Sequence, residues 1–388
     1  MKLPEWAAGL IERFEKNGFE AYAVGGCVRD MLLGNPPGDY DFAVSSLPEE
    51  TKKVLKGLPI YDTGLRHGTV TAAVGGHMAE ITTYRTESGY SDFRRPDQVA
   101  FTRSLEEDLS RRDFTINAMA FHPQRGVVDC FGGREDLKSK LLRCVGEPDK
   151  RFQEDALRLL RCLRFSSVLG FTVEKATGKA LLSHKELLRE IAPERIQAEF
   201  SKLVLGRGAE RVLTEYRQVI DVFLPEAGLR REALDCLPPE GQLRLAGVFS
   251  GCTPWETEQA MKRLRYDNKT IRTVAALEQY RGVPLEKNRS QVRKLVNALG
   301  VKTTEDLLRF RREPVLLGLL EEVRGQNLCC SLDQLAVSGR DLIRLGYPEG
   351  RKIGKTLDRL LALVLDEAIQ NHRGVLLEKA ESWLKQNS

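Results

Sequence analysis

Two aspartates one residue apart, Asp39 and Asp41, are the first residues in this sequence whose type and spacing indicate chemistry. Side chains at positions i and i+2 of an extended strand project from the same face. Two carboxylates held side by side repel each other unless a cation lies between them. Phosphoryl transfer assisted by two metal ions needs such a pair, and Mg²⁺ prefers hard oxygen ligands while leaving positions for substrate phosphates. The spacing therefore predicts a Mg²⁺ site for phosphoryl transfer.

A glycine pair, Gly25-Gly26, and then Arg29 precede the two carboxylates. Residues 21–44 are predicted to form a strand, a glycine turn, the start of a helix, a loop and a second strand. Backbone amides in such a turn can bind phosphate groups. An Asp-x-Asp pair alone is a weak signal, because many strands end in two aspartates at a turn. A phosphate-binding turn combined with a metal-binding pair favours a nucleotidyltransferase.

Strand signals after the carboxylate pair predict an α/β head. Residues 68–74 and 78–85 alternate in polarity or are rich in β-branched residues, and a Gly-Gly turn separates them, which predicts a hairpin. Glu80 lies on the second strand, where it would bring a third carboxylate beside Asp39 and Asp41. On pattern alone, an exposed strand residue without a catalytic role explains Glu80 equally well.

The polar segment 86–121 is rich in arginine and aromatic residues. This composition suits a mobile loop over a nucleotide site, and it also suits an ordinary solvated connection. The part from Ser104 onwards is predicted to be helical, with Ser104 as N-cap and Glu107 in the capping-box position. Residues 127–137 are predicted to form a strand, a Gly-Gly turn and a short helix that end the head.

Helical periodicity dominates from about Lys140 onwards, and one long helix is predicted over residues 149–170. The predicted fold class is an α/β nucleotidyltransferase head, a small mixed β-sheet with helices, followed by an all-α neck, body and tail. The predicted boundaries are 1–140 for the head, 141–205 for the neck, 206–285 for the body and 286–388 for the tail.

Composition excludes several classes of protein. The longest apolar run near the C-terminus, 360–365, is far shorter than the ~20 residues of a membrane-spanning helix. The N-terminal residues follow an amphipathic pattern without the apolar region of a signal peptide, so we expect a cytoplasmic protein. A net charge of +5 is compatible with a nucleic-acid partner without indicating one. The eight cysteines form no C-x-x-C pair and the five histidines are scattered, so we expect reduced thiols and no zinc site.

Five motifs occur in a fixed order: GG-x-VRD, GDYD, RRDFTINA (111–118), EDALRLLR (154–161) and ERIQAEF (194–200). On these motifs the chain resembles the bacterial class II tRNA nucleotidyltransferases, the CCA-adding enzymes of the DNA polymerase β superfamily. The resemblance covers residues 20–205 and extends weakly into 335–350.

Roles for individual residues follow from the resemblance. Asp39 and Asp41 would bind Mg²⁺, with Glu80 as a third carboxylate. Arg112 and Asp113 would contact the ribose, which implies a ribonucleotide substrate. The remaining nucleotide contacts implied are Gly26 and Arg29 for the triphosphate, with Arg161 and Arg164.

The EDALR motif can also be argued from base chemistry. Cytosine and adenine present an amine donor beside an unprotonated ring nitrogen, whereas guanine and uracil present a carbonyl beside an N–H. A carboxylate with a guanidinium matches cytosine and adenine, and Asp155 and Arg158, three apart on one predicted helix face, supply that pair. A surface ion pair between Glu154 and Arg158 is the alternative. Ideal helix geometry rotates Arg164 nearly opposite Asp155, so a packing or tRNA-phosphate role is its alternative.

Departures from the family pattern bear on the alternatives. Cys130 replaces the proline of the family's D-P-F-G-G turn, which affects the hinge expected there and leaves the chemistry intact. A poly(A) polymerase is disfavoured because residues 62–70 lack the basic segment of those enzymes and residues 340–388 are nearly charge-balanced. A CC-adding relative is disfavoured because the loop at 87–95 is complete.

The favoured hypothesis is template-independent addition of C, C and A to tRNA 3′ ends from CTP and ATP, with both nucleotides read in one pocket. An A-adding tRNA nucleotidyltransferase shares every motif, and an inactive RNA-binding protein is the non-enzyme alternative. The helical remainder is expected to bind the tRNA acceptor arm. Candidate contacts there, which a solvated helix face explains equally well, are Arg293, Lys294, Arg351, Lys352 and Lys355. The sequence leaves the oligomeric state open.

Overall fold

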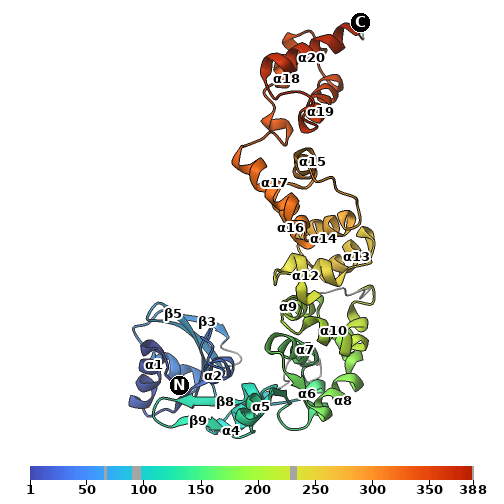
Figure 1. Ribbon diagram of the computed structural model, residues 1–388. Coiled ribbons are helices and arrows are strands. Elements are labelled where there is room, and N and C mark those ends of the chain that lie inside the picture. Colours follow the sequence, from blue (N-terminus) through green and yellow to red (C-terminus); the bar gives the residue numbers. More distant parts are fainter. Residues whose placement is uncertain (65–67, 90–97, 228–233, 387–388) are drawn as a thin grey trace. The chain divides into compact units, whose positions relative to one another are not determined.

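The computed structural model describes residues 1–64, 68–89, 98–227 and 234–386. It divides into two compact units, one built from Met1–Ala227 and the segment up to Gly241, the other from Gln242 onwards (Figure 1). Within the described ranges, no helix is long and apolar enough to cross a membrane.

A seven-stranded mixed sheet forms the centre of the head, as predicted. Its strand order is β3-β4-β5-β2-β1-β8-β9, and every pairing is antiparallel except that of β2 with β5. The strand bounds are β1 Ala21–Val24, β2 Asp41–Val44, β3 Ile60–Gly64, β4 Thr69–Val74, β5 His77–Thr83, β8 Met119–His122 and β9 Gly126–Asp129.

Helix α1 (Glu5–Lys16) packs on one face of this sheet through an apolar stripe, and α3 (Pro48–Val54) contacts β4. The predicted β4–β5 hairpin is confirmed, and its inward residues alternate with outward ones. On the opposite face, α4 (Leu105–Ser110) contributes Leu109 to a small buried cluster with Tyr22, Val24, Ala43, Tyr84 and Ala120.

Segment 86–121 differs from its prediction in two ways. Strands β6 (Arg85–Ser88) and β7 (Gln98–Phe101) pair as a hairpin, whereas residues 90–95 of the loop proposed at 87–95 lie outside the described residues. The predicted continuous helix after Ser104 is wrong, because α4 ends at Ser110 and a 3-10 turn, η2 (Thr115–Asn117), leads into β8. The Asp113 carboxylate accepts the backbone N–H of Phe114 at 2.8 Å, a local bond that competes with helix continuation.

The single helix predicted over 149–170 is also wrong. It is two helices, α6 (Pro148–Glu154) and α7 (Leu157–Leu169), and Asp155 between them is extended, with φ −138° and ψ 102°. The Asp155 carboxylate accepts the N–H of Leu157 at 3.1 Å, so the side chain caps the second helix while its backbone ends the first.

The rest of the first unit is helical except for a short parallel pair, β10 (Leu141–Leu142) with β11 (Thr172–Val173), in a region predicted to be all-α. Sequence periodicity missed this pair because two residues cannot establish an alternation. The helices not yet named are α2 Gly26–Leu32, α5 Gly133–Lys138, α8 Lys175–Ser183, α9 Pro193–Val204, α10 Ala209–Glu215 and α11 Arg217–Phe223.

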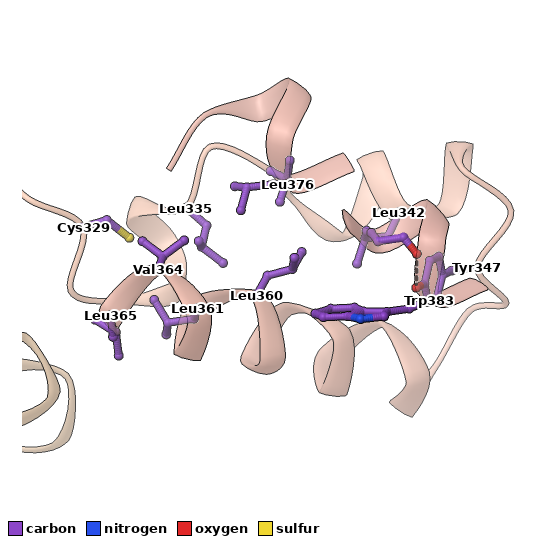
Figure 2. Close-up of a cluster of buried hydrophobic side chains, with 12 residues drawn as sticks. Cys329, Leu335, Leu342, Tyr347, Leu360, Leu361, Val364, Leu365, Leu376 and Trp383 are labelled. Atoms are coloured by element: carbon purple, nitrogen blue, oxygen red, sulfur yellow. Dashed lines mark hydrogen bonds between the residues drawn. The ribbon is translucent and has the colours of Figure 1, made fainter. Parts of the chain in front are cut away.

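The second unit is built of helices, and its last part has a core of its own. Figure 2 shows this tail core, in which Leu360, Leu361 and Val364 of α19 pack with Leu376 and Trp383 of α20. The helix bounds, starting with the one at the junction, are α12 Gly241–Val248, α13 Pro254–Arg263, α14 Asn268–Tyr280, α15 Arg289–Leu299, α16 Val301–Phe310, α17 Pro314–Gly325, α18 Gly339–Arg344, α19 Arg351–Leu365 and α20 Arg373–Gln386.

Two of the basic residues suggested for tRNA binding have internal partners. Arg293 is buried and donates two hydrogen bonds to the carbonyl oxygen of Cys329, at 2.6 and 3.0 Å. Lys294 forms an ion pair with Asp366. For Arg293 the prediction of an RNA contact is wrong, because a buried guanidinium that holds a loop carbonyl is part of the fold.

Candidate active site

A polar pocket of about 430 Å³ lies in the first unit, and every predicted site residue except Glu80 lines it. The β1–α2 turn, the start of β2, the RRD segment and α7 all contribute to its walls. The lining residues are Gly25, Gly26, Arg29, Asp39, Asp41, Arg111, Arg112, Asp113, Asn117, Asp155, Arg158, Arg161, Arg164 and Phe165. Motifs separated by more than a hundred residues of sequence therefore meet in one place.

Asp41 is the first residue of β2, between two strands that fix its position. Asp39 precedes this strand, which corrects the prediction that both carboxylates lie on it. Its register partners are Val24 on β1 and Glu80 on β5. Burial, together with the negative charges of Asp39 and Glu80, raises the pKa of Asp41 to about 6, although the Arg112 guanidinium acts in the opposite direction. Burial is the main cause of this rise, and the charges of Asp39 and Glu80 add to it, so a cation bound here would favour the charged form of Asp41.

The carboxylates fit Mg²⁺ better than a metal that needs a complete protein cage. Throughout the described ranges, no three His, Cys, Asp or Glu side chains are grouped so that they could hold a metal ion by themselves. Asp39 and Asp41 line the pocket as a pair, and Glu80 stands one strand away. Mg²⁺ is usually held by one or two carboxylates together with substrate phosphates, and this donor set matches that pattern.

The turn after β1 requires glycine at position 25. Gly25 has φ +76°, and a Cβ atom there would lie 2.8 Å from Nη1 of Arg112. The glycine therefore lets the Arg112 guanidinium lie against the turn. On the following helix, Arg29 donates to Oδ1 of Asn117 at 2.7 Å, which links the first motif to the RRDFTINA motif.

Asp113 is held by Arg161 in a close ion pair. Nε and Nη2 of Arg161 donate to Oδ2 of Asp113 at 2.8 and 2.6 Å, and Asn117 donates to the other oxygen at 3.1 Å. Burial raises the pKa of Asp113, but Arg161 and Asn117 outweigh it and lower the pKa to about 2. Asp113 is therefore an anion that positions two pocket side chains.

Phe165 is a pocket residue that sequence reasoning missed. Its ring lies 4.1 Å from the guanidinium carbon of Arg164, 5.2 Å from that of Arg29 and 5.4 Å from that of Arg161. Arg164 is also paired with Glu199 of α9 at 2.9 Å. The signal was available in the sequence, since Phe165 follows Arg161 by one helical turn and therefore shares its face.

Arg158 is fixed by the ion pair that the sequence offered as its alternative role. Its Nη1 lies 2.7 Å from Oε2 of Glu154, and its Nη2 donates to the carbonyl oxygen of Arg111 at 3.0 Å. The side chain is buried and is not a surface residue. The ion pair with Glu154 therefore exists, Arg158 also lines the pocket, and its role in base selection stays a prediction.

Asp155 and Arg158 do not share one continuous helix, which corrects the predicted geometry. The break at Asp155 places it at the junction of α6 and α7, where Arg195 of the ERIQAEF motif approaches its Oδ1 at 3.5 Å. The break also changes the relation of Asp155 to Arg164. The prediction that Arg164 lies nearly opposite Asp155 assumed one continuous helix, and in the structure both residues line the same pocket.

Arg111 is the second residue that sequence reasoning missed. Its guanidinium donates to Oδ1 of Asp108 at 2.8 Å and to Oε1 of Glu87 at 3.0 Å. Arg85 donates to the same Glu87 oxygen at 2.8 Å. These bonds connect the β6–β7 hairpin to the pocket wall.

Family models match three segments of the chain, and known proteins match its whole length. Residues 21–143 match the poly A polymerase head domain, residues 170–227 the RNA and SrmB-binding site of polymerase A, and residues 247–380 the tRNA nucleotidyltransferase domain 2. The CCA-adding enzyme of Pediococcus pentosaceus is 38% identical over 399 residues, covering 98% of both chains.

Solved structures match as well. The Bacillus stearothermophilus CCA-adding enzyme in complex with CTP has a TM-score of 0.85 at 30% identity, covering 100% of this chain and 99% of its own. A tRNA nucleotidyltransferase complexed with a primer tRNA and an incoming ATP analog has a TM-score of 0.66 at 27% identity, over 82% of this chain and 99% of its own.

Proposed function

The chain belongs to the CCA-adding tRNA nucleotidyltransferases, and from that membership we propose how its own residues perform the reaction. The enzyme adds C, C and A to the 3′ end of tRNA, using CTP and ATP. In each step the 3′-hydroxyl oxygen bonds to the α-phosphorus, the bond to the bridging oxygen breaks, and pyrophosphate leaves. The observation that carries the assignment of residues is the single pocket in which carboxylates, arginines and the EDALR motif meet.

Asp39 and Asp41 hold Mg²⁺ in this proposal, because both carboxylates line the pocket and are only one residue apart in the chain. When bound there, Mg²⁺ stabilises charge on the attacking and leaving oxygens. Glu80 is proposed as the third carboxylate, since it is the register partner of Asp41. The ion supports the chemistry, and the protein side chains orient the nucleotide.

The arginines of the pocket bind the triphosphate and ribose in this proposal. Arg29, on the helix after the glycine turn, faces the polyphosphate together with Gly26, and Arg112 with Asp113 addresses the ribose. Arg161 and Arg164, which lie around Phe165, complete the nucleotide contacts. Guanidinium groups suit this task because their planar donors match phosphate oxygens.

Asp155 and Arg158 select the base in this proposal. Arg158 is immobilised by Glu154 and by the carbonyl oxygen of Arg111, so its plane is set before a nucleotide arrives. Asp155 accepts from the exocyclic amine and Arg158 donates to the ring nitrogen, an arrangement that serves cytosine and adenine and rejects guanine and uracil. One reading pair serves both nucleotides, and the growing 3′ end sets which one follows.

The assay that tests this function uses purified protein with tRNA that ends at the discriminator base. CTP alone is expected to give two added residues, ATP alone none, and both together the complete CCA end. Absence of CTP incorporation combined with ATP incorporation on tRNA ending in CC would instead assign A-addition. Asp39→Ala is expected to abolish the addition of both C and A. Unchanged rates in this variant would contradict the assignment of Asp39 as a Mg²⁺ ligand.

The parts beyond the pocket complete the proposal. The neck over residues 141–205 carries the base-reading residues, and the body and tail, 206–285 and 286–388, bind the tRNA acceptor arm by shape and charge. Arg351, Lys352 and Lys355 remain the tail candidates. We propose a cytoplasmic location, where tRNA and nucleoside triphosphates are available.

A further inference from the structure

The sheet face that carries Asp41 continues across three neighbouring strands. The strand register places Asp41 opposite Glu80, Glu80 opposite Thr71, and Thr71 opposite Tyr61. Residues that oppose each other in a ladder project from the same face of a sheet. These four side chains therefore form one row from β2 to β3, with about 4.8 Å between successive strands.

Among the described residues, this face is buried over one half of the sheet and exposed over the other. Over β1, β2 and β8 it is buried beneath the small cluster that includes Leu109 of α4. Over β5 the pattern changes, since Met78 and Glu80 are exposed while Ala79 and Ile81, on the opposite face, are fully buried. The exposed half is thus the half that begins at Glu80.

Two large apolar side chains lie on this open half. Met78 is 55% exposed and Tyr61 is 48% exposed, and they flank the Glu80–Thr71 part of the row. Most exposed apolar residues need no explanation when they occur singly. A tyrosine ring and a thioether on the sheet face that also carries Glu80, however, form a surface on which nucleobases can stack.

The nucleotide pocket lies on the other side of Asp41. Its glycine turn follows β1 directly, whereas the row of exposed residues runs through β5, β4 and β3. In phosphoryl transfer the attacking and leaving oxygens are roughly in line across the phosphorus. If the triphosphate occupies the β1 side, the attacking hydroxyl must arrive from the β5 side.

We propose that this open half, the β3–β5 face defined by Tyr61, Thr71, Met78 and Glu80, binds the 3′-terminal nucleotides of the acceptor RNA. The inference rests on the proposed function, because it takes Asp41 as the point of attack. Met78 and Tyr61 contact the bases, and the row leads the terminal ribose towards Asp41. The contacts are stacking contacts, so this face tolerates different bases as the end grows from the discriminator base to CC.

The test is an equilibrium binding experiment without nucleotide, so that it does not depend on catalysis. Two RNAs are compared: a tRNA ending in CC, and the same tRNA shortened to remove its 3′ single strand. Tyr61→Ala and Met78→Ala are each expected to weaken binding of the CC-ended tRNA about 5- to 20-fold, which lies in the lower part of the range for losing one stacking contact. Binding of the shortened tRNA is expected to stay within twofold.

Leu47→Ala is the matched control, because Leu47 is 46% exposed in the same head but precedes α3 away from this face. It is expected to change neither affinity, and Tyr61→Phe is expected to retain binding. Equal affinity of the double variant Tyr61→Ala/Met78→Ala for the CC-ended tRNA would overturn the proposal. Equal weakening for both RNAs would also overturn it, by indicating a general structural role. Failure of the proposed function would appear separately, as absent incorporation by wild-type protein that still binds tRNA.

Discussion

Two aromatic rings, Phe165 in the pocket and Trp383 in the tail core, are both contacted by cations, but in opposite settings. Arg359 lies 3.9 Å from the Trp383 ring, which belongs to a cluster of leucines and valines (Figure 2). Phe165 instead lies among three guanidiniums. In the tail, the cation covers the edge of an apolar core. In the pocket, the ring separates like charges.

The electrostatic consequence differs accordingly. Burial and the neighbouring charges of Arg161 and Arg29 lower the pKa of Arg164, although Glu199 acts in the opposite direction. Six arginines and four aspartates line the pocket, so it carries an excess of positive charge that a triphosphate would neutralise. The tail core has no comparable cluster of like charges among its buried residues, and its contacts stabilise the fold. Substitutions in the two regions should therefore affect different measurements.

The largest effect is expected for Asp41→Asn. Loss of this carboxylate should lower the rate of nucleotide addition about a thousandfold, the value of several kcal/mol of transition-state stabilisation. The measurement is single-turnover incorporation of CTP at saturating Mg²⁺. The control is Asp366→Asn, which removes a carboxylate that pairs with Lys294 in the second unit. A rate loss of less than tenfold in Asp41→Asn would contradict the assignment.

Leu360→Ala should give the complementary result in the tail. Leu360 is fully buried in the tail core, and its truncation should lower the free energy of unfolding by about 2–5 kcal/mol. Urea denaturation measures this change, with the exposed Leu332→Ala as control. The incorporation rate at a temperature where the variant is folded should stay within twofold. A large loss of incorporation rate in folded Leu360→Ala would show that the tail core affects catalysis as well as stability.

Phe165→Leu tests what the aromatic ring contributes to nucleotide binding in the pocket. Without the ring, the guanidiniums of Arg29, Arg161 and Arg164 lose a common contact, and the KM for nucleotide should rise about tenfold. The factor should be equal for CTP and ATP, because these arginines face parts common to both. Trp383→Leu should leave both KM values unchanged while lowering stability. A change confined to one nucleotide would show that Phe165 takes part in base selection.

The smallest effect concerns the pH dependence of stability. The pKa of Asp41 is raised in the folded protein, so the fold binds its proton more tightly than the unfolded chain does. Stability should therefore fall as the pH rises from about 4 to about 6, and remain lower above it. At pH 7 without Mg²⁺, the free energy of unfolding of Asp41→Asn should exceed that of wild type by on the order of 1 kcal/mol. This difference should vanish near pH 3. Mg²⁺ should reduce this difference in stability at pH 7. Identical thermal unfolding of variant and wild type at every pH would contradict the raised pKa of Asp41.

Sequence reasoning was most successful where chemistry and local pattern agreed. The strand that carries Asp41 and the hairpin that carries Glu80 follow from residue type and periodicity, whereas most of the pocket arginines were expected from the family resemblance. Glu80 shows the limit of this reasoning. Its position beside Asp41 depends on a parallel pairing that no local pattern encodes.

The errors have a common physical origin. At Asp155 a helix ends and the side chain binds a nearby backbone N–H, and Asp113 makes a similar local bond just beyond the end of α4, in segments where periodicity would continue a helix. Periodicity counts apolar residues and does not register this competition. Phe165 and Arg111 each also have one partner in a distant segment, Arg29 and Glu87 respectively, and periodicity cannot indicate those contacts.

The parallel pairing of β2 with β5 also has a consequence for how the head forms. A β1–β2 pairing is closed by a short connection, whereas β2–β5 requires the chain to return over α3, β3 and β4. Contacts between distant segments are slow to form, because the chain loses the entropy of the intervening loop before these contacts stabilise it. During synthesis the glycine turn and the aspartate pair can associate early, Glu80 joins only after β5 has emerged, and Asp155 later still. A nascent head is therefore expected to be unable to consume nucleotide until the neck has left the ribosome.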